Sequence, residues 1–545
     1  MMVIALTALL VITPFFWLGD PSGHDFEFHL NSWMEVLSQW KQGILYPRWA
    51  AMAHFGYGEA RFVFYPPLSW LLGALLGACL PWRFVPGAFV WIALVLSGAS
   101  MYALARQYLS EGEAIFAAAL YAANPYYLVV IYWRSAYAEL LAGALLPLLL
   151  LFVLRAEQLG NRAVIPLSLI VAGAWLTNAP AAVMVNYSLA LLLIFAAIRQ
   201  RSSRLLWYGA AAAAIGAALA AFYVVPAAYE QKWVNIGEVL SLGVRPIDNF
   251  LFTTMPDVDH NRFNLLVSVV AFAELAAMVA LTGLMLRKKP VSELGWTLLA
   301  WSVVSSVLMF RFTLFAWDHF PKLRFVQLPW RWLLCLNLAF ALLLVMASRR
   351  WLVRGLTCAV MLLVIVMVWQ RVQPPWWDTY LDLFVMQDDI KIAKGYEGTD
   401  EYVPAGADPY EIDREARRVI WEGSGHSFIH ILKWDAESRV FLIDVDQPGN
   451  AVLRLFNYPA WSVEVNGQVS TPVTREVTGQ MVIPLQPGKN SIMLTFSRTL
   501  DRTIGGLISL VTAGLLAVFW SRWRDQQLAI SGAGANTGAL VRDRV

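Results

Sequence analysis

Apolar runs long enough to cross a lipid bilayer recur along almost the whole chain. A helix needs about 20 mainly apolar residues to span about 30 Å of hydrocarbon. Candidate runs lie near residues 2–18, 84–105, 113–131, 137–154, 163–179, 182–198, 205–225, 264–286, 294–311, 329–347, 355–371 and 503–520. The chain is 59% hydrophobic and only 14% charged, far more apolar than a soluble domain. We therefore expect an all-α polytopic membrane protein with about 12 transmembrane helices.

Basic residues between the runs predict how the spans are oriented. Lys and Arg favour the cytosolic ends of membrane spans. They stand at every second connection, as Arg106, Arg155, Arg162, Arg199, Arg201, Arg204, Arg287, Lys288, Lys289, Arg349, Arg350, Arg354, Arg522 and Arg524. If these connections are cytosolic, the spans alternate in direction without a skipped span, and both termini are cytosolic. Residues 2–18 lack a signal-peptide cleavage site, so we expect them to be a retained span. A full span at residues 67–80 would upset the alternation, so a helix in or beside the membrane interface is expected there.

The composition changes after the eleventh run. In residues 439–446, 450–456, 461–465 and 491–496, β-branched and aromatic residues recur with a period of two, and Asn466-Gly467 is a hairpin turn signal. We predict an external β-sandwich domain over residues 373–502. It follows a transmembrane domain over 1–372 and precedes a final transmembrane helix at 503–521 and a cytoplasmic tail at 522–545.

Several classes of function are disfavoured by the composition. The net charge is only +3 and the basic residues are scattered, so nucleic acid is not an expected partner. Cys79, Cys335 and Cys358 lie in apolar segments without ligand spacing, which predicts neither a disulfide framework nor a zinc site. No signature of a soluble enzyme stands in a credible setting. An enzyme built on this chain would therefore act on an external, membrane-borne substrate.

The first external loop, residues 19–82, carries charge directly after the first span, in His24-Asp25-Phe26-Glu27-Phe28-His29. In a helix, Asp25 and His29 share one face at i and i+4, whereas Glu27 lies off that face. Asp25 could then take a proton from a bound hydroxyl while His29 orients it. The alternative is an amphipathic helix whose carboxylates are only solvated.

Two later external segments combine charge with aromatic residues. Charge beside a membrane interior costs free energy and so suggests function. In Tyr132–Glu139, the guanidinium of Arg134 could hold a phosphate bidentately, although a helix dipole alone could accommodate Glu139. In Lys322–Arg331, basic groups among aromatics could bind an anionic lipid head group or simply snorkel at the interface. Asp257-Val258-Asp259-His260 could bind a divalent ion, but a solvated loop is favoured.

Short motifs, in this order, resemble the GT-C superfamily of integral membrane glycosyltransferases. They are Gly43-x-x-Tyr46-Pro47-Arg48-Trp49, Gly56-Tyr57-Gly58, Phe64-Tyr65-Pro66-Pro67-Leu68, Arg134-Ser135-Ala136-Tyr137-Ala138-Glu139, Leu323-Arg324-Phe325, Pro329-Trp330-Arg331 and Asp400-Glu401-Tyr402-Val403-Pro404. Within it the chain is similar to bacterial membrane proteins labelled "6-pyruvoyl-tetrahydropterin synthase-related", and more distantly to lipoteichoic-acid-glycosylating proteins. The label does not describe an enzymatic activity of this chain. A pterin synthase is a soluble zinc enzyme, and this chain lacks a plausible soluble His-rich zinc site.

The resemblance implies roles for particular residues. Asp25 would be the base that activates the acceptor hydroxyl, with inversion at the anomeric carbon, and Glu139 the second acidic residue. Polyprenyl phosphate would be bound by Arg134, Arg324 and Arg331. The catalytic candidates are thus Asp25, Glu27 and Glu139, and the substrate-binding candidates are His29, Arg48, Tyr65, Arg134, Tyr137, Arg324, Gln327 and Arg331. Relatives often carry His near Asn178, so no role is assigned to Asn178; metal dependence varies in the superfamily, which leaves a divalent metal ion open as cofactor.

We therefore expect sugar transfer from a polyprenyl-phosphate carrier in the lipid bilayer to a glycan, lipid or protein acceptor. By resemblance and charge pattern, the membrane would be a bacterial inner membrane, with the β-domain periplasmic. One alternative is a flippase or transporter of lipid-linked sugar, which would need polar or broken helices at mid-membrane and an inverted repeat. Another is a non-catalytic scaffold that displays the β-domain.

Overall fold

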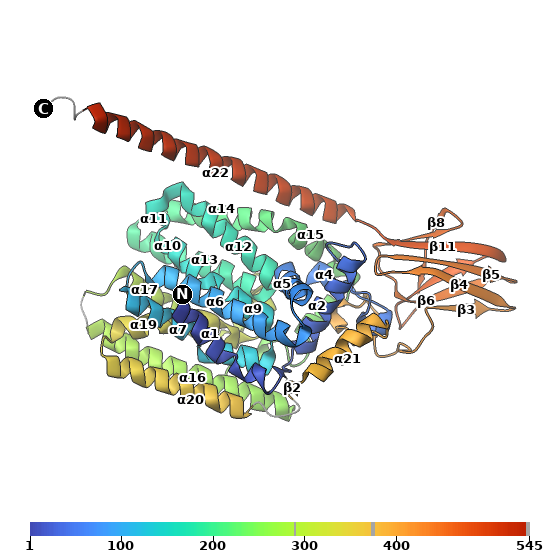
Figure 1. Cartoon of the computed structure of the whole chain (residues 1–545), viewed down its shortest axis with the longest axis horizontal. Helices are drawn as coiled ribbons and strands as arrows, with labels where there is room; N and C mark the ends of the chain where they lie inside the picture. Colours follow the sequence, from blue (N-terminus) through green and yellow to red (C-terminus); the bar gives the residue numbers. More distant parts are fainter. Residues whose placement is uncertain (288–289, 372–375, 541–545) are drawn as a thin grey trace.

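A helical region and a β-sheet region lie at opposite ends of the long axis of the molecule (Figure 1). The computed structural model describes residues 1–287, 290–371 and 376–540, with side chains described as far as Ser521 in the last range. Lys288, Lys289 and the predicted domain boundary at 372/373 lie outside the described residues, as do the side chains of Arg522 and Arg524. The helix α22 (Leu500–Leu540) leaves the β-sheet region and runs along the helical region toward its far end.

The helices give fewer complete membrane spans than the sequence predicts. Nine described segments are long and apolar enough to span: Trp82–Ala105, Glu111–Arg134, Tyr137–Leu154, Ala156–Thr177, Ala179–Gln200, Val258–Arg287, Pro329–Ala347, Trp351–Arg371 and Leu500–Ser521. Two bent pairs, Arg204–Leu219 with Ala221–Trp233 (78°) and Glu293–Val307 with Arg311–His319 (89°), would raise the number to 11. The predicted first span contains α1 (Met2–Val11), whose 10 residues are too few to cross alone, and a separate 3-10 helix, η1 (Thr13–Phe16). The described chain thus has 9 to 11 candidate spans rather than about 12.

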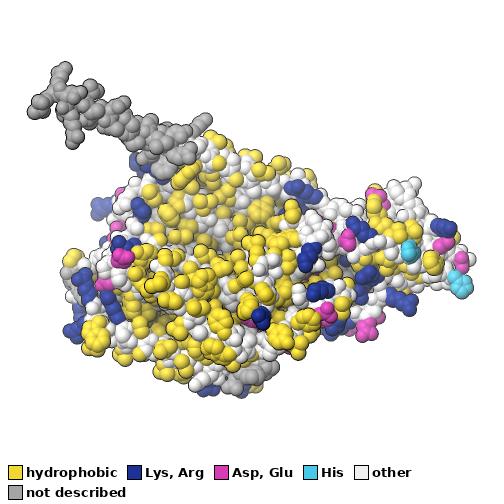
Figure 2. Space-filling model, viewed as in Figure 1, with side chains coloured by type: hydrophobic (Ala, Val, Ile, Leu, Met, Phe, Trp, Pro, Cys, Tyr) yellow, Lys and Arg dark blue, Asp and Glu magenta, His cyan; other side chains and the backbone are white. Residues whose placement is uncertain are grey.

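The outer surface of the helical region suits a lipid environment. Figure 2 shows hydrophobic side chains over its middle, whereas Lys, Arg, Asp and Glu gather toward its two ends and on the β-sheet region. Exposed apolar residues such as Leu265, Phe272 and Val279 follow one another along the outside of α16 (Val258–Arg287). Because exposed hydrocarbon in such quantity is unfavourable in water, this surface fits burial in a bilayer.

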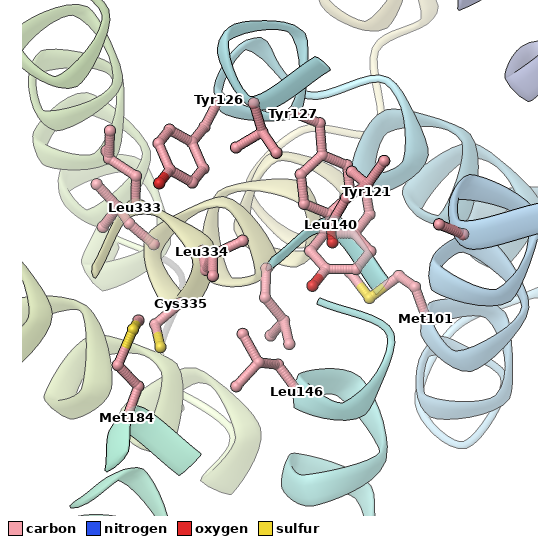
Figure 3. Packing of buried hydrophobic residues seen from close by; sticks show 14 of the residues in the cluster. Met101, Tyr121, Tyr126, Tyr127, Leu140, Leu146, Met184, Leu333, Leu334 and Cys335 are labelled. Carbon is pink, nitrogen blue, oxygen red and sulfur yellow. The ribbon is translucent and has the colours of Figure 1, made fainter. Parts of the chain in front are cut away.

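The interior of the helical region is a continuous hydrophobic core (Figure 3). Tyr121 of α7 (Glu111–Ala122), Leu140 of α9 (Tyr137–Ala142) and Cys335 of α19 (Leu333–Ala347) are buried there. The other helices of this region are α6 (Val85–Ala105), α8 (Pro125–Val129), α10 (Leu145–Leu154), α11 (Ala156–Leu159), α12 (Val164–Thr177), α13 (Ala179–Gln200), α14 (Arg204–Leu219), α15 (Ala221–Glu230), α17 (Glu293–Val307), α18 (Leu314–His319) and α20 (Trp351–Arg371). Cys335 packs as a small apolar residue, and all three cysteines are free.

The first loop forms a layer of short helices at the end of the helical region nearer the sheets (Figure 1). They are α2 (Phe26–Lys41), α3 (Ala53–Gly56), α4 (Arg61–Phe64) and α5 (Pro67–Cys79). The 13 residues of α5 are too few to span a bilayer, which agrees with an interfacial position. Gly73 of α5 leaves the space that the indole ring of Trp33 fills, and this ring also stacks on Phe89 at 4.8 Å.

The C-terminal region contains two antiparallel sheets. One has the order β3 (Val419–Gly423), β6 (Gly449–Phe456), β10 (Gln480–Leu485), β9 (Val473–Thr474), and the other β4 (Ser427–Trp434), β5 (Ser438–Val445), β11 (Gly488–Phe496), β7 (Trp461–Val465), β8 (Gln468–Ser470). Buried residues of both sheets belong to one hydrophobic cluster. The predicted strands are confirmed, and so is the hairpin at Asn466-Gly467, where both residues have positive φ and Val465 pairs with Gln468. Two further short elements, β1 (Asp20–Pro21) and β2 (Trp377–Asp378), pair before α21 (Tyr380–Lys391).

The first loop also fastens the sheets to the helical region. Trp49 is buried in the same cluster as the sheet residues and meets Trp461 edge to face at 5.9 Å. The hydroxyl of Tyr57 donates to the carbonyl of Asp413 at 2.9 Å. Arg502 of α22 pairs with the buried carboxylate of Glu230 at 2.7 Å. Motifs that suggested a functional loop in the sequence therefore build this junction.

Candidate functional site

A cavity of about 590 Å³ lies where the first loop, the ends of several helices and the segment before the sheets meet. Its wall includes His24, Asp25, Tyr65, Arg134, Glu139, Trp175, Asn178, Val183, Tyr223, Val224, Lys322, Phe325, Gln327, Leu328, Arg331, Thr399, Glu401 and Tyr402. The volume lies within the range of small-molecule sites. Charged and apolar surfaces therefore share one cavity.

Glu139 is the centre of the charged part of this wall. Its carboxylate pairs with the guanidinium groups of Arg134 and Arg331, and Arg331 Nε lies 2.9 Å from Glu139 Oε2. The hydroxyl of Tyr126 donates to the other carboxylate oxygen. All of these side chains are almost completely buried. One carboxylate thus holds two cations in fixed positions, where either can also face a bound anion.

The local backbone explains how Arg134 reaches this position. The span that begins with α7 ends in a single π-helical turn, Val130–Arg134, and the next residue, Ser135, is left-handed with φ 50°. The Ser135 hydroxyl donates to the carbonyl of Pro21 at 2.6 Å and accepts from the amide of Gly23 at 3.0 Å. Such irregular turns often occur at functional sites. Here the turn fixes the first loop against the end of the span.

Asp25 occupies the N-terminal end of α2, next to Arg134. Its amide donates to the carbonyl of Arg134 at 2.8 Å, and its carboxylate lies 3.4 Å from the Arg134 guanidinium. The side chain is 38% exposed and lines the cavity, so it is within reach of a ligand. Glu27, the other loop carboxylate predicted to be catalytic, is exposed and does not line the cavity. It lies off the Asp25 face of the helix.

His29 and Tyr137 lie behind the cavity wall rather than on it. The His29 ring is buried, 5.3 Å from the Tyr137 ring and 5.8 Å from the Tyr65 ring. Burial lowers the pKa of His29 to about 4, against a smaller opposing effect of Asp25. The imidazole is therefore neutral near neutral pH and packs beneath Tyr65, which does line the cavity. A supporting role fits this position better than the predicted contact with substrate.

Arg331 and Gln327 connect the site to the short helical turn η6 (Ile236–Leu240). Arg331 Nη1 donates to the Gln327 side-chain oxygen at 2.9 Å and to the carbonyl of Val326 at 2.7 Å. The Gln327 amide in turn donates to the carbonyl of Val239 at 2.8 Å. Arg324 is exposed and does not line the cavity, whereas Lys322 does. Lys322 has a left-handed backbone conformation, φ 61°, directly before the helical turn Leu323–Val326 that contains Arg324.

Arg48 is also absent from the cavity wall. Its guanidinium donates to the carbonyl of Phe222 at 3.2 Å and lies 4.5 Å from the centre of the Tyr46 ring. These contacts hold the first loop against α15. The motif that contains Arg48 is therefore placed at a packing contact and not, as the sequence suggested, at a ligand.

Asn178, Lys322 and Glu401 are among the lining residues that were not sequence candidates. Asn178 stands at the break between α12 and α13, and its side chain caps α13 by accepting from the amide of Ala181 at 2.9 Å. The signal for this break is the Asn-x-Pro sequence at a helix start. Lys322 and Glu401 lie within motifs quoted above, but nothing in their sequence distinguished them from their charged neighbours. Packing decides which of these side chains reaches the cavity.

No group of three or more His, Cys, Asp or Glu side chains that could hold a metal ion is found among the described residues. In the segment predicted to be either an ion site or a solvated loop, Asp257 Oδ1 accepts from the amides of Asp259 and His260 at 2.9 and 3.1 Å. Asp259 forms an exposed ion pair with Arg262. Asp257 therefore caps the start of α16, as in the solvated alternative.

The chain matches a known protein family. A family model described as "6-pyruvoyl-tetrahydropterin synthase related domain; membrane protein" matches residues 62–374. The matched region includes Arg134, Glu139 and Arg331, whereas Asp25 and Glu401 lie outside it. No curated protein matches the chain.

Proposed function

We propose that this chain, which belongs to the 6-pyruvoyl-tetrahydropterin synthase related family of membrane proteins, is a glycosyltransferase that moves a sugar from a polyprenyl-phosphate carrier to an external acceptor. The observation that carries the proposal is the cavity wall, where Asp25 lies beside the paired cations Arg134 and Arg331. A carboxylate suits proton removal from a hydroxyl, and guanidinium groups suit a phosphate.

The reaction would proceed as one displacement. The Asp25 carboxylate takes the proton of the acceptor hydroxyl while the hydroxyl oxygen bonds to the anomeric carbon of the sugar. The bond from that carbon to the phosphate oxygen breaks, and polyprenyl phosphate leaves with the electron pair. Arg134 and Arg331 stabilise the charge on the leaving phosphate, since both guanidinium groups are held beside the cavity in advance. The anomeric configuration is inverted.

Other features of the wall support a lipid-linked donor. Apolar and aromatic residues, among them Trp175, Val183, Val224, Phe325 and Leu328, line the same cavity as the charged groups. A prenyl chain needs such an apolar path, whereas the sugar and phosphate need polar partners. Lys322 adds a third basic group to this wall, which also carries the carboxyl groups of Asp25, Glu139 and Glu401. Its ammonium group is a further possible partner for a bound phosphate.

The proposal includes an orientation in a bacterial inner membrane. The cavity and the sheets, stacked as a β-sandwich, would be periplasmic, and both termini cytosolic. Connections that carry the basic residues meet one another: Arg354 pairs with Glu113 at 2.8 Å, and Gln200 donates to Glu293 at 2.7 Å. α11 and α17 lie at the end of the helical region away from the sheets (Figure 1). This grouping supports one basic, cytosolic face.

The test is transfer of radiolabelled sugar from polyprenyl-phosphate donors by purified protein in lipid nanodiscs. Wild type, Asp25→Asn and Glu27→Gln are compared. We expect Asp25→Asn to lose at least about 100-fold in kcat, because the amide cannot accept a proton. Glu27→Gln should retain activity, since Glu27 lies off the cavity. If wild type transfers no sugar from any donor of the panel, the transferase is rejected.

A flippase for lipid-linked sugar is the second candidate, favoured by a bent helix pair and by polar residues inside spans. The pair Arg204–Leu219 with Ala221–Trp233 is bent by 78°, and Tyr223 and Val224 of its second helix line the cavity. Glu274 of α16 is buried within a candidate span, close to Asn337 of α19. Such residues inside spans often mark a transport path. Movement of a fluorescent polyprenyl-phosphate sugar across proteoliposomes, in protein that transfers nothing, would favour this function.

A further inference from the structure

Glu401 brings a carboxyl group to the cavity from the segment that leads into the sheets. It belongs to the short helical turn η11 (Asp400–Tyr402), and Thr399, Glu401 and Tyr402 all line the cavity. The side chain is partly buried. Among the described residues it forms no ion pair and no hydrogen bond to another side chain. This carboxyl group is therefore available to a ligand in the cavity.

The backbone around Glu401 is fixed on both sides. Before it, the amide of Thr399 donates to the buried carboxylate of Glu59 at 2.9 Å. After it, the Tyr402 ring stacks on Phe64, with 5.6 Å between ring centres. The chain is then held further along, where the amide of Asn235 donates to the carbonyl of Val403 at 2.9 Å. Glu401 is thus presented to the cavity by a pre-organised backbone.

The surroundings of Glu401 disfavour its charged form. Burial raises the pKa of Glu401 to about 7; the carboxylates of Glu59 and Asp400 act in the same direction, and Arg61 opposes them. The element packed against η11 is η6 (Ile236–Leu240), whose charged residue, Glu238, is exposed. The remaining charged or titratable groups on the cavity wall are His24, Asp25, Tyr65, Arg134, Glu139, Tyr223, Lys322, Arg331 and Tyr402.

Asp25 and Glu401 differ in their partners on the wall. The Asp25 carboxylate lies 3.4 Å from the Arg134 guanidinium. Glu401 has no such partner and is protonated in a substantial fraction of molecules near neutral pH. A protonated carboxyl group both donates and accepts hydrogen bonds, as a sugar hydroxyl does.

We propose that Glu401 is a substrate-binding residue whose protonated carboxyl group donates a hydrogen bond to a sugar hydroxyl in the cavity. This role rests on the proposed function and deepens it, because it assigns sugar recognition to the segment before the sheets. The hydroxyl belongs either to the donor sugar or to a sugar acceptor.

The test measures equilibrium binding to full-length protein in nanodiscs. The probes are polyprenyl phosphates that carry glucose, mannose or arabinose, and the same lipid without sugar. Wild type is compared with Glu401→Ala, Glu401→Gln and, as a matched control, Glu238→Gln. The side-chain amide introduced by Glu401→Gln can donate a hydrogen bond but does not titrate, so this variant separates hydrogen bonding from charge.

If the donor sugar is bound, wild type prefers one glycosylated lipid over the bare lipid, and Glu401→Ala weakens that preference roughly tenfold without changing bare-lipid binding. Glu401→Gln and Glu238→Gln keep the preference. Between about pH 6 and pH 8.5 the second ionisation of the bare phosphate monoester lowers the preference in every variant, and ionisation of Glu401 lowers it further in wild type than in Glu401→Gln. A structural role would not produce rescue by Gln together with loss of this additional pH dependence.

If the acceptor is bound instead, Glu401→Ala keeps the lipid preference and raises KM for methyl glycoside acceptors at unchanged kcat, and Glu401→Gln restores KM. The role is overturned if Glu401→Ala binds and transfers like wild type, or if the preference increases with pH. If wild type transfers sugar, either of these results overturns only the role of Glu401 and not the proposed glycosyltransferase function. A wild type that neither distinguishes glycosylated from bare lipid nor transfers sugar rejects the transferase and this role together.

Discussion

Arg331 Nε lies 2.9 Å from Glu139 Oε2, although 192 residues separate the two along the chain. Arg134 pairs with the same carboxylate oxygen. The pairing places two cations at the proposed phosphate site and compensates their burial. Replacing the Glu139 carboxylate would leave Arg331 buried without an anion and Arg134 with only the 3.4 Å contact to Asp25, which is costly.

We therefore expect Glu139→Ala and Arg331→Ala each to destabilise the protein by about 3–5 kcal/mol. The double variant should lose less than the sum of the two, because both single changes remove the same pair. Thermal unfolding of the four proteins in detergent measures this coupling. Additive losses would show that the pair contributes little to stability.

Lys322 and Arg324 form a second matched comparison. Lys322 lines the cavity and Arg324 is exposed outside it. We expect Lys322→Ala to weaken binding of polyprenyl phosphate roughly tenfold, and Arg324→Ala to have no measurable effect. Affinities measured in nanodiscs at low and high salt decide between them. If Arg324→Ala weakened binding more than Lys322→Ala, Arg324 would be the phosphate contact, as the sequence predicted.

The pH dependence of stability should reflect Glu35. This carboxyl group is buried and accepts hydrogen bonds from the amide of Met52, at 3.1 Å, and from the hydroxyl of Tyr396. Burial raises the pKa of Glu35 from 4.5 to about 7. The folded state therefore binds more protons than the unfolded state between these values, so the contribution of Glu35 is complete below pH 4.5 and is lost as pH rises through about 7.

We expect Glu35→Gln to reduce the loss of stability between about pH 5 and pH 8 by roughly 2–3 kcal/mol. The change would appear as a smaller difference in apparent melting temperature between the two conditions. Glu27→Gln, which alters an exposed carboxylate, is the control and should retain the wild-type difference. An unchanged profile in Glu35→Gln would assign the pH dependence to other groups.

Gly58 and Gly43 test how the first loop holds the sheets. Both have positive φ, 78° and 84°. A Cβ on Gly58 would overlap the indole ring of Trp49, whereas a Cβ on Gly43 would meet no atom within 4 Å. We expect Gly43→Ala to cost about 1–2 kcal/mol for its backbone alone, and Gly58→Ala clearly more. Thermal unfolding and protease sensitivity of residues 408–500 measure both; equal losses would exclude the Trp49 clash.

Local patterns in the sequence predicted the elements of this protein. Long apolar runs gave most of the candidate spans, because a helix that crosses hydrocarbon must be apolar over a fixed length. The length of the first span was overestimated, because the apolar run continues beyond Val11, where α1 ends. The recurrence of β-branched and aromatic residues with a period of two predicted β7 and β11, because side chains in a strand alternate between two faces. The sequence Asn466-Gly467 predicted the hairpin that joins β7 to β8.

The candidate site depends on the tertiary structure. The sequence placed Asp25, Glu139 and Arg331 in external segments, but only the packing of helices and loops shows that they share one wall. Arg48 and Arg324 had the same appearance in the sequence and point elsewhere, because a side chain's direction follows from backbone turns such as the left-handed one at Lys322. Hydrophobic length and periodicity act within one segment and can be read from it; which charges meet is decided by contacts between segments up to hundreds of residues apart.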